Sequence, residues 1–167
     1  MKLEGSCHCK GIKFTFTSST PVPYNRCYCS ICRKVQGGGG YAINIMGAYS
    51  TLEYEVNKGI ELKGYKAIMN YNDSTEKQKF SGNTRYFCGN CSSNLWAYDP
   101  TYKDYFYPFA SAIDSELPNE GDYNICHIKL NSKASWVSIP DPNSSKCSLY
   151  NDYPTDSIEN WHKKNFK

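Results

Sequence analysis

Residues 12–16 of the chain read IKFTF, so that every second side chain is apolar and the ones between are polar. Side chains of a β-strand point alternately to the two faces of a sheet, and this period of two therefore predicts a strand with one buried face. The same pattern recurs at residues 41–45, YAINI, and 52–56, LEYEV. Further short strands are predicted at 64–71, 84–87, 94–97, 107–110, 126–130 and 134–137. The chain is therefore expected to be mainly β, with mostly antiparallel strands.

Residues that favour turns separate several of these strands. They occur at 57–59 (NKG), 72–73 (ND) and 81–83 (SGN). Gly, Asn and Asp tolerate the backbone conformations of tight turns, which is why they mark strand ends. The stretch 140–145, with two prolines, an asparagine and two serines, predicts an exposed loop rather than a domain linker, because too little chain follows it to form a second core.

A helix is predicted only at the C-terminus. Asp156 is a candidate N-cap, with Glu159 three positions later. Ile158 and Trp161 are three positions apart, so that one face of a short helix can lie on the sheet. The basic tail that follows has a structural explanation, since cations interact favourably with the C-terminus of a helix.

The composition indicates one folded domain over residues 1–167. With 40% hydrophobic and 15% aromatic residues, the chain has the apolar material for a core that disordered sequences lack. Its 19 Lys and Arg against 16 Asp and Glu give a net charge of +3, too small to indicate binding to nucleic acid or to an anionic membrane. No apolar run of about 18 residues is present, and the first residues, MKLEGS, lack the apolar core of a signal peptide. We therefore expect a soluble protein of the cytoplasm, with the nucleus as an alternative.

The 9 cysteines are the main chemical feature of the sequence. Thiols in the cytosol and nucleus stay reduced, and close recurrent spacings there indicate metal ligands rather than disulfides. Seven of them lie in three clusters, CHC at 7–9, CYCSIC at 27–32 and CGNC at 88–91. A structural zinc takes four protein ligands, whereas a catalytic zinc takes three and leaves one position for water or substrate. We therefore predict a closed zinc site and an open one, formed respectively by Cys7, Cys9, Cys88 and Cys91 and by Cys27, Cys29 and Cys32.

Each assignment has an alternative. In a secreted chain, the same cysteines would form an incomplete disulfide framework. From the residues alone, a closed second zinc is the commoner use of a Cys-rich loop, and Cys126, His127 or Cys147 could supply its fourth ligand. Otherwise Cys126 and Cys147 are ordinary buried thiols. His8 lies between two proposed ligands, so we expect its ring to point away from the metal or to support it from behind a ligand.

Arg33 and Lys34 directly follow the middle cluster. An anionic ligand at the metal would find a guanidinium and an ammonium there, which suits a carboxylate; a solvated pair at a turn is the alternative. The four glycines at 37–40 lack the Lys and hydroxyl residue of a phosphate loop, so a nucleotide site is not expected. They would instead let the backbone approach whatever occupies the site.

Three motifs resemble the glutathione-dependent formaldehyde-activating enzyme family, which also includes centromere protein V. They are GSCHC at 5–9, CYCSICRK at 27–34, and CGNC at 88–91 followed by a small-residue pair and a leucine. Later segments, at 108–114 and 153–162, are similar to fungal-type members, so the resemblance covers nearly the whole chain.

Two residues depart from the pattern of the family that the chain resembles. Tyr28 stands where many relatives have His, which removes one candidate proton carrier. Lys10 replaces a Gly that often follows the first motif, a change that matters if the backbone there is left-handed. Neither position is a proposed metal ligand.

The resemblance implies a fold of coiled antiparallel sheets around a zinc ribbon, shared with Rab nucleotide-release chaperones and B-type methionine sulfoxide reductases. It also implies two zinc ions per chain, with the division of cysteines given above. The implied activity is that of a carbon–sulfur lyase that forms S-hydroxymethylglutathione from glutathione and formaldehyde, or cleaves it. Arg33 and Lys34 would then hold the carboxylates of glutathione. The expected partners are thus a small thiol and an aldehyde, with no nucleic acid and no membrane; the oligomeric state is not predicted.

Two other functions compete with this one. A zinc-stapled interaction module would need an exposed aromatic surface, for which the Tyr-rich stretch 98–107 is the candidate, although core packing explains that stretch as well. A methionine sulfoxide reductase would need a free nucleophilic cysteine of low pKa, and Cys126 or Cys147 would have to serve.

Overall fold

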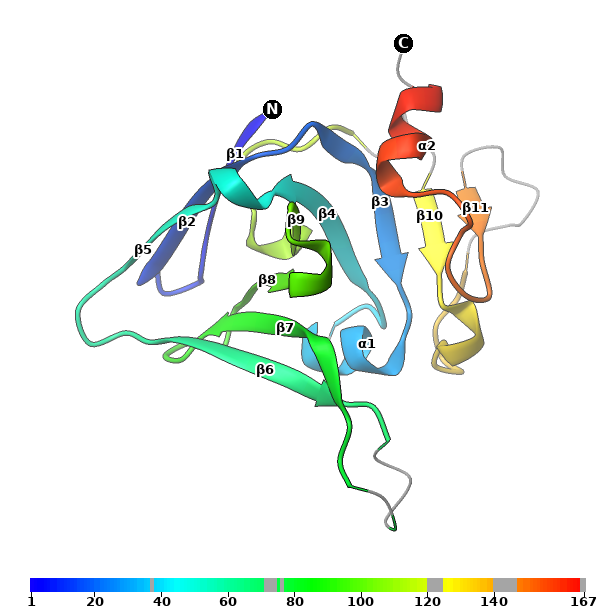
Figure 1. Cartoon of the computed structure of the whole chain (residues 1–167), viewed down its shortest axis with the longest axis horizontal. Coiled ribbons are helices and arrows are strands. Elements are labelled where there is room, and N and C mark those ends of the chain that lie inside the picture. The colour runs from blue at the N-terminus through cyan, green and yellow to red at the C-terminus, as the bar shows by residue number, and fades with distance from the viewer. Residues whose placement is uncertain (37, 71–74, 76, 120–124, 140–146, 166–167) are drawn as a thin grey trace.

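Two β-sheets make up the framework of the protein (Figure 1). The structure is a computed structural model that describes residues 1–36, 38–70, 75, 77–119, 125–139 and 147–165. The smaller sheet contains, in spatial order, β1 (Lys2–Ser6), β2 (Ile12–Thr17) and β5 (Glu53–Val56). The larger sheet contains, in spatial order, β11 (Cys147–Leu149), β10 (Ile125–Ile128), β3 (Thr20–Cys27), β4 (Ala42–Ala48), β9 (Tyr105–Pro108), β8 (Asn94–Tyr98), β7 (Phe80–Cys88) and β6 (Leu62–Ile68). The prediction of a mainly β protein is confirmed.

The stretch 12–16 forms the middle strand of the smaller sheet, as its alternation predicts. Its three apolar side chains are each at most 1% exposed. Phe14 lies opposite Gly5 on β1 and Tyr54 on β5. Gly5 leaves room for this packing, because a Cβ there would lie 2.4 Å from both the Phe14 ring and the carbonyl oxygen of Ala112. A strand with one buried face is therefore confirmed here.

The larger sheet is antiparallel except around β10, which runs parallel to both β3 and β11. Strand β3 is not predicted from the sequence, because Pro21 and Pro23 lack the N–H groups of a regular strand. The structure accommodates them through a shift in register between Thr20 and Asn25, where β3 pairs with β4. Strand β3 matters to the site, because its last residue is Cys27.

Two local predictions are wrong. Residues 134–137 form a turn rather than a strand, in which the Val137 N–H donates to the Ala134 carbonyl at 3.1 Å. The turn predicted at 81–83 lies inside β7, where the pairing with β6 shifts register. A bulge leaves residues of one strand unpaired, so turn-favouring residues are tolerated there without ending the strand.

Other predicted segments are confirmed in part. The stretch 52–56 contains β5, but this is an edge strand on which Tyr54 and Val56 are both exposed. The strand predicted at 64–71 forms as β6 and ends at Ile68. Strands β1 and β11 have no counterpart in the prediction. The predicted turn at 72–73 and loop at 140–145 lie outside the described residues.

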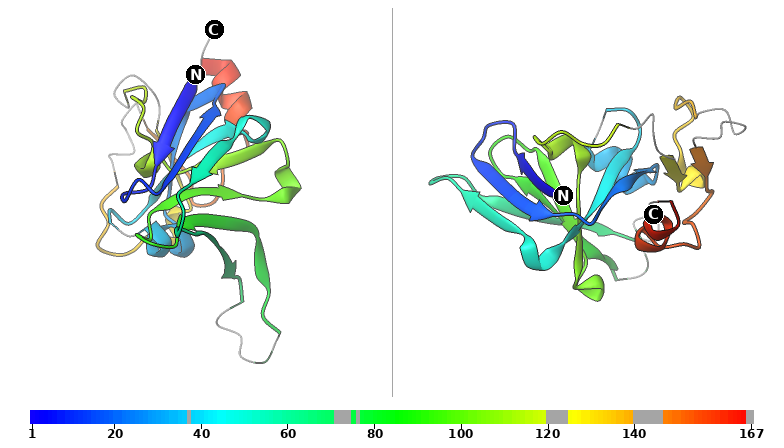
Figure 2. Two further views of the ribbon diagram at one scale, coloured as in Figure 1. Left: turned by 90° about the vertical axis from the view of Figure 1, so that its left-hand side faces the viewer. Right: turned by 90° about the horizontal axis from the view of Figure 1, so that it is seen from above.

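The predicted C-terminal helix forms as α2 (Ile158–Asn165), which packs against β3 (Figures 1 and 2). Its Trp161 lies against buried residues of that strand. The cap differs from the prediction by one position, because the Asn160 N–H donates to Ser157 Oγ at 3.1 Å, while Asp156 pairs with Lys164 at 2.6 Å. No helix in the described part of the chain has the length and apolar character needed to span a bilayer.

The aromatic stretch 98–107 is mostly packed into the protein. Phe106 is completely buried, and the ring of Tyr98 stacks on that of Tyr49 with centres 4.0 Å apart. Tyr102, at 59%, is the strongly exposed aromatic residue of the stretch. The stretch therefore does not form the continuous aromatic face that an interaction module would require.

Candidate metal centres and the neighbouring cavity

The four cysteines predicted to share a metal come together where the turn between β1 and β2 approaches the turn between β7 and β8. We call Cys7, Cys9, Cys88 and Cys91 the four-cysteine group. Their Sγ atoms all lie within 4.8 Å of one another, with 3.5 Å between Cys7 and Cys9 and 3.8 Å between Cys9 and Cys88. Thiolates arranged as a tetrahedron about 2.3 Å from a zinc ion are about 3.8 Å apart. The group therefore fits a tetrahedral metal ion.

Two similar backbone turns present these thiols. The Cys7 carbonyl accepts from the Lys10 N–H at 2.8 Å, and the Cys88 carbonyl accepts from the Ser92 N–H at 2.9 Å. Lys10 and Ser92 both have left-handed backbones, with φ of 58° and 61°. Glycine adopts this conformation without a steric penalty, whereas residues with a Cβ do not. Lys10, which stands where relatives often have Gly, therefore occupies a backbone position that favours glycine.

Burial disfavours the deprotonated form of the four-cysteine group, so that a bound cation is needed to stabilise its thiolates. Cys7 is completely buried, and desolvation raises the pKa of its thiol to about 12. The Ile12 N–H donates to Cys7 Sγ at 3.2 Å, which favours a negative sulfur. Metal ligation requires deprotonated cysteines, so binding of a divalent ion would release protons from the group.

The second set of cysteines lies where β3 leads into α1 (Ser30–Gln36). We call Cys27, Cys29 and Cys32 the three-cysteine group. Their Sγ atoms lie within 4.8 Å of one another, and the Cys32 N–H donates to Cys29 Sγ at 3.3 Å. Hydrogen bonds from the other two thiols lower the pKa of Cys29 to about 2, while hydrogen bonding to Cys29 raises the pKa of Cys27. The group thus holds one thiolate readily and needs a cation to hold three.

Helix α1 is not predicted from the sequence, which indicated a loop and a turn here. Its 7 residues are too few to show a helical period. The Arg33 N–H donates to the Cys29 carbonyl at 3.1 Å and closes the first turn. Arg33 is half-buried, with a buried Nε that has no hydrogen-bond partner, and Lys34 is exposed. The two predicted substrate-binding residues therefore lie on a helix that begins at the three-cysteine group.

Among the described residues, no fourth Cys, His, Asp or Glu joins the three-cysteine group. Cys126 is buried in the apolar cluster that contains part of the group, and desolvation raises its pKa to about 11. His127 directs its Nδ1 to the Tyr28 hydroxyl at 2.7 Å. Cys147 is half-buried on β11 and lies outside the group. In the structure, none of these three residues supplies a fourth ligand that would close the second site.

Two residues near the three-cysteine group carry no sequence signal for a site. Arg85 on β7 is 7% exposed and lies opposite Ala97, which packs in one apolar cluster with Cys27 and Cys32. Desolvation, followed by the charges of Cys27, Cys29 and Cys32, raises the pKa of the Tyr153 phenol to about 12. Both residues are far from the cysteines in the chain, so spacing could not indicate them.

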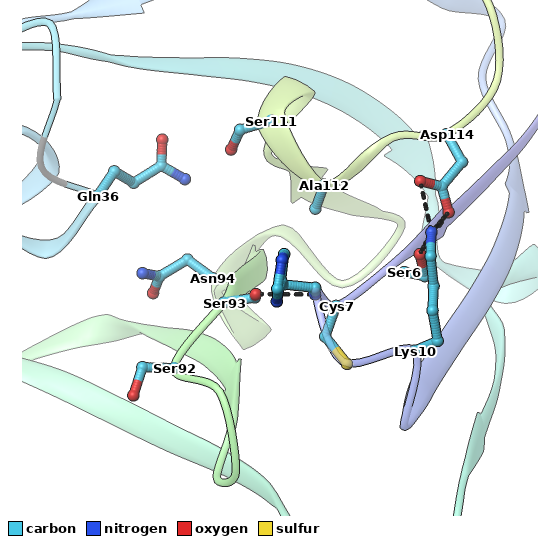
Figure 3. Close-up of a pocket in the computed structure, with 11 residues that line it drawn as sticks. Ser6, Cys7, Lys10, Gln36, Ser92, Ser93, Asn94, Ser111, Ala112 and Asp114 are labelled. Carbon is cyan, nitrogen blue, oxygen red and sulfur yellow. Dashed lines mark hydrogen bonds and ion pairs between the residues drawn. The ribbon is translucent and has the colours of Figure 1, made fainter.

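A polar cavity of about 430 Å³ lies beside the four-cysteine group (Figure 3). On one side, Lys10 Nζ donates to Ser6 Oγ at 2.8 Å and pairs with Asp114 at 3.3 Å. On the other side lies Gln36, whose Nε2 is buried and has no hydrogen-bond partner. The remaining lining residues are Cys7, His8, Ser92, Ser93, Asn94, Ser111 and Ala112. The cavity thus borders the last residue of α1, whereas the three-cysteine group is at the start of that helix.

The chain matches the family model for glutathione-dependent formaldehyde-activating enzymes over residues 2–122. It belongs to this family. A protein of Halomonas elongata, whose name carries the same family description, is 43% identical over 166 residues, which cover 97% of this chain and 95% of that protein. The similarity therefore extends well beyond residue 122. Family membership confirms the resemblance found in the sequence, while the fungal-type subgroup and the link to centromere protein V stay predictions.

A solved structure supports the fold of this glutathione-dependent formaldehyde-activating enzyme family member. It is a crystal structure of a Rhodobacter sphaeroides protein, with a TM-score of 0.52 and 16% identity. The likeness covers 75% of this chain and 99% of the Rhodobacter chain. At this identity it concerns the arrangement of strands and carries no statement about substrate.

In this member of the formaldehyde-activating enzyme family, Tyr28 stands where many relatives have His, and its surroundings show what a tyrosine does at this position. Its side chain is completely buried and packs between Tyr41 and His127, with ring centres 5.2 and 5.7 Å away. Desolvation raises the pKa of Tyr28 to about 12, so its hydroxyl stays protonated near neutral pH. It is therefore a hydrogen-bonding group in the core and not a base at the site.

Proposed function

We propose that this protein is a zinc-dependent carbon–sulfur lyase that interconverts glutathione and formaldehyde with S-hydroxymethylglutathione at Cys27, Cys29 and Cys32. The observation that carries the proposal is the three-cysteine group itself, which no further donor among the described residues completes. Three protein ligands leave one position on a zinc ion for a substrate. Membership of the glutathione-dependent formaldehyde-activating family supports the choice of thiol and aldehyde.

The reaction needs a sulfur nucleophile and a proton balance. A bound zinc would supply acidity to the glutathione thiol, so that its sulfur is present as a thiolate near neutral pH. The sulfur adds to the carbonyl carbon of formaldehyde, one carbon–sulfur bond forms, and the carbonyl oxygen takes up the proton that the thiol released. Cleavage is the reverse of these steps. The reaction requires no oxidant or reductant, which is consistent with a site made of thiols that stay reduced.

Helix α1 supplies the groups that we propose for holding the substrate. Arg33 and Lys34 follow Cys32 directly and offer two cations for the carboxylates of glutathione. From Cys29 to Gln36 the helix rises about 10 Å, which is also about the reach of an extended tripeptide. The cavity at that end, with the Lys10 ammonium in its wall, is thus within range of the far end of the same substrate.

We propose two zinc ions per chain. A structural ion would be held by the four-cysteine group, whose spacing fits a tetrahedron, and a catalytic ion by the three-cysteine group. The proposed location is the cytoplasm, with the nucleus as the alternative, in keeping with reduced cysteines as ligands.

The two competing functions lose their main support in the structure. A methionine sulfoxide reductase needs an accessible thiol of low pKa, for which the candidates are Cys126 and Cys147. Cys126 is buried and desolvation raises its pKa to about 11, whereas Cys147 is half-buried, so support for this function is reduced to Cys147. An interaction module needs an exposed aromatic face, but the stretch 98–107 is mostly packed inward. Lyase chemistry at the three-cysteine group is therefore the better-supported function.

The deciding experiment measures exchange between glutathione and S-hydroxymethylglutathione by two-dimensional NMR exchange spectroscopy, with the uncatalysed rate as the baseline. Wild-type protein loaded with zinc is expected to accelerate this exchange, and Cys32→Ser to abolish the acceleration while remaining folded. Cys126→Ala, which removes a buried thiol outside the group, is the matched control and should keep the activity. No acceleration by fully zinc-loaded wild type would refute the lyase proposal.

A further inference from the structure

Arg85 has a buried side chain whose surroundings connect it to the three-cysteine group. On β7 it lies opposite Ala97 of β8. Residues that lie directly opposite each other in antiparallel strands project to the same face of the sheet. Ala97 is 4% exposed and packs in the apolar cluster that contains Cys27 and Cys32. The Arg85 side chain therefore lies on the face of the larger sheet that covers the cysteines.

Within the part of the chain that the structure describes, no acidic side chain forms an ion pair with the guanidinium of Arg85. Its Nε and Nη1 are buried and without a hydrogen-bond partner. A buried charge is costly unless it is paired or hydrogen-bonded. On the face of the sheet where Arg85 lies, the candidate negative charge is that of the three-cysteine group, because Ala97, opposite Arg85, packs in one cluster with Cys27 and Cys32.

The effect of the Arg85 guanidinium depends on the net charge of the three-cysteine group with a divalent ion bound. Three thiolates around a divalent ion carry a net charge of minus one, which one guanidinium offsets. A neutral fourth ligand leaves this balance unchanged, whereas an anion adds a second negative charge in a largely buried place. Charges interact more strongly there than in water, so a nearby cation acts mainly on ligands that arrive as anions.

We propose that Arg85 is a specificity-determining residue that favours an anionic fourth ligand, such as a thiolate, over a neutral one at the three-cysteine group. The inference rests on the proposed function to the extent that it needs an open position on the metal, but it requires neither catalysis nor glutathione. The substrates of this site are then compounds that bind the metal as anions through sulfur. Small anions are expected to compete with them for the same position.

The test compares ligand binding to the cobalt-loaded full-length protein, followed by visible absorption, in wild type, Arg85→Met and Arg85→Lys. Thiocyanate is the anionic probe and imidazole the neutral one. Arg85→Met is expected to weaken thiocyanate binding by about tenfold or more and to leave imidazole binding within about twofold, since a neighbouring charge distinguishes only the anion. Arg85→Lys, which keeps the charge, should retain most of the preference. Lys66→Met is the matched control, because it removes an exposed cation from the neighbouring strand β6.

Four results would overturn the proposal. Equal loss of both probes in Arg85→Met would make Arg85 a structural residue, and unchanged binding of both would remove its influence altogether. If Arg85→Met takes up no cobalt, the Arg85→Gln variant is tested in its place. Loss of metal in both variants would show that Arg85 is needed to form the metal site of the three-cysteine group and does not select its fourth ligand. Failure of wild type to bind either probe would contradict the open position. Wild type that selects anions through Arg85 but does not accelerate glutathione exchange would refute the lyase proposal alone.

Discussion

The hydroxyl of Tyr28 lies 2.7 Å from Nδ1 of His127, and both side chains are completely buried. The contact links the residue between Cys27 and Cys29 to strand β10. The backbone adds to this link, because the Tyr28 N–H donates to the Ile128 carbonyl at 3.0 Å. The loop that carries two thiols of the three-cysteine group is thus fixed to the sheet by a polar contact inside the core.

Tyr28→Phe is expected to reduce the stability of the protein and its hold on the second metal. The ring keeps its packing, but the buried His127 nitrogen loses this partner, which costs about 1–3 kcal/mol of unfolding free energy. Urea unfolding measures the loss, and competition with a chelator measures metal affinity. Tyr41→Phe is the matched control and should change both much less, because Tyr41 is a half-buried tyrosine whose ring contacts that of Tyr28 at a tilted angle. Equal effects of the two changes would show that the Tyr28 hydroxyl contributes nothing specific.

Both cysteine groups could be predicted because much of their geometry is local. Two thiols separated by one or two residues are held together by a single turn, as the Cys7 and Cys88 turns show. The alternation at 12–16 was equally informative, because β2 has one buried and one more exposed face.

The parts that the sequence did not reveal depend on contacts between distant segments. On β7, Tyr86 stacks on Trp96 at 5.6 Å while Arg85, next to it, is buried on the opposite face. Alternation assigns one face of a strand to solvent, so it fails where both faces are covered. Helix α1 cannot be predicted for a different reason, since its 7 residues are too few to show a helical period and are held by the segments around them.

The left-handed backbone at Lys10 predicts a difference between two substitutions. Lys10→Gly and Lys10→Ala both remove the exposed ion pair with Asp114, which contributes little. Only Gly also relieves the steric penalty of the positive φ of 58°, worth about 1 kcal/mol. Lys10→Gly should therefore be more stable to urea than Lys10→Ala by about this amount. A more stable Ala variant would contradict the account of this turn.

Metal stoichiometry should separate the two cysteine groups. Wild type is expected to contain two zinc ions per chain by elemental analysis, and Cys32→Ser one, with an unchanged far-ultraviolet circular dichroism spectrum. Cys91→Ser should instead lower the melting temperature by about 10 °C or more, because the four-cysteine group joins turns that are 79 residues apart at Cys9 and Cys88. Equal effects of the two substitutions on melting would contradict the division into structural and catalytic sites.

Burial of Cys126 predicts a dependence of stability on pH. Desolvation raises the pKa of this thiol from 9.0 to about 11, so between these values the unfolded chain loses a proton that the folded protein keeps. Its contribution to stability is therefore present below about pH 9 and is lost as the pH rises toward about 11. The difference in unfolding free energy between wild type and Cys126→Ala should shrink by about 1 kcal/mol from about pH 7.5 to about pH 9.5, since both proteins carry the same metal groups. Parallel pH profiles in urea titrations would mean that Cys126 ionises in the folded protein, which would reopen a role for it as a nucleophile.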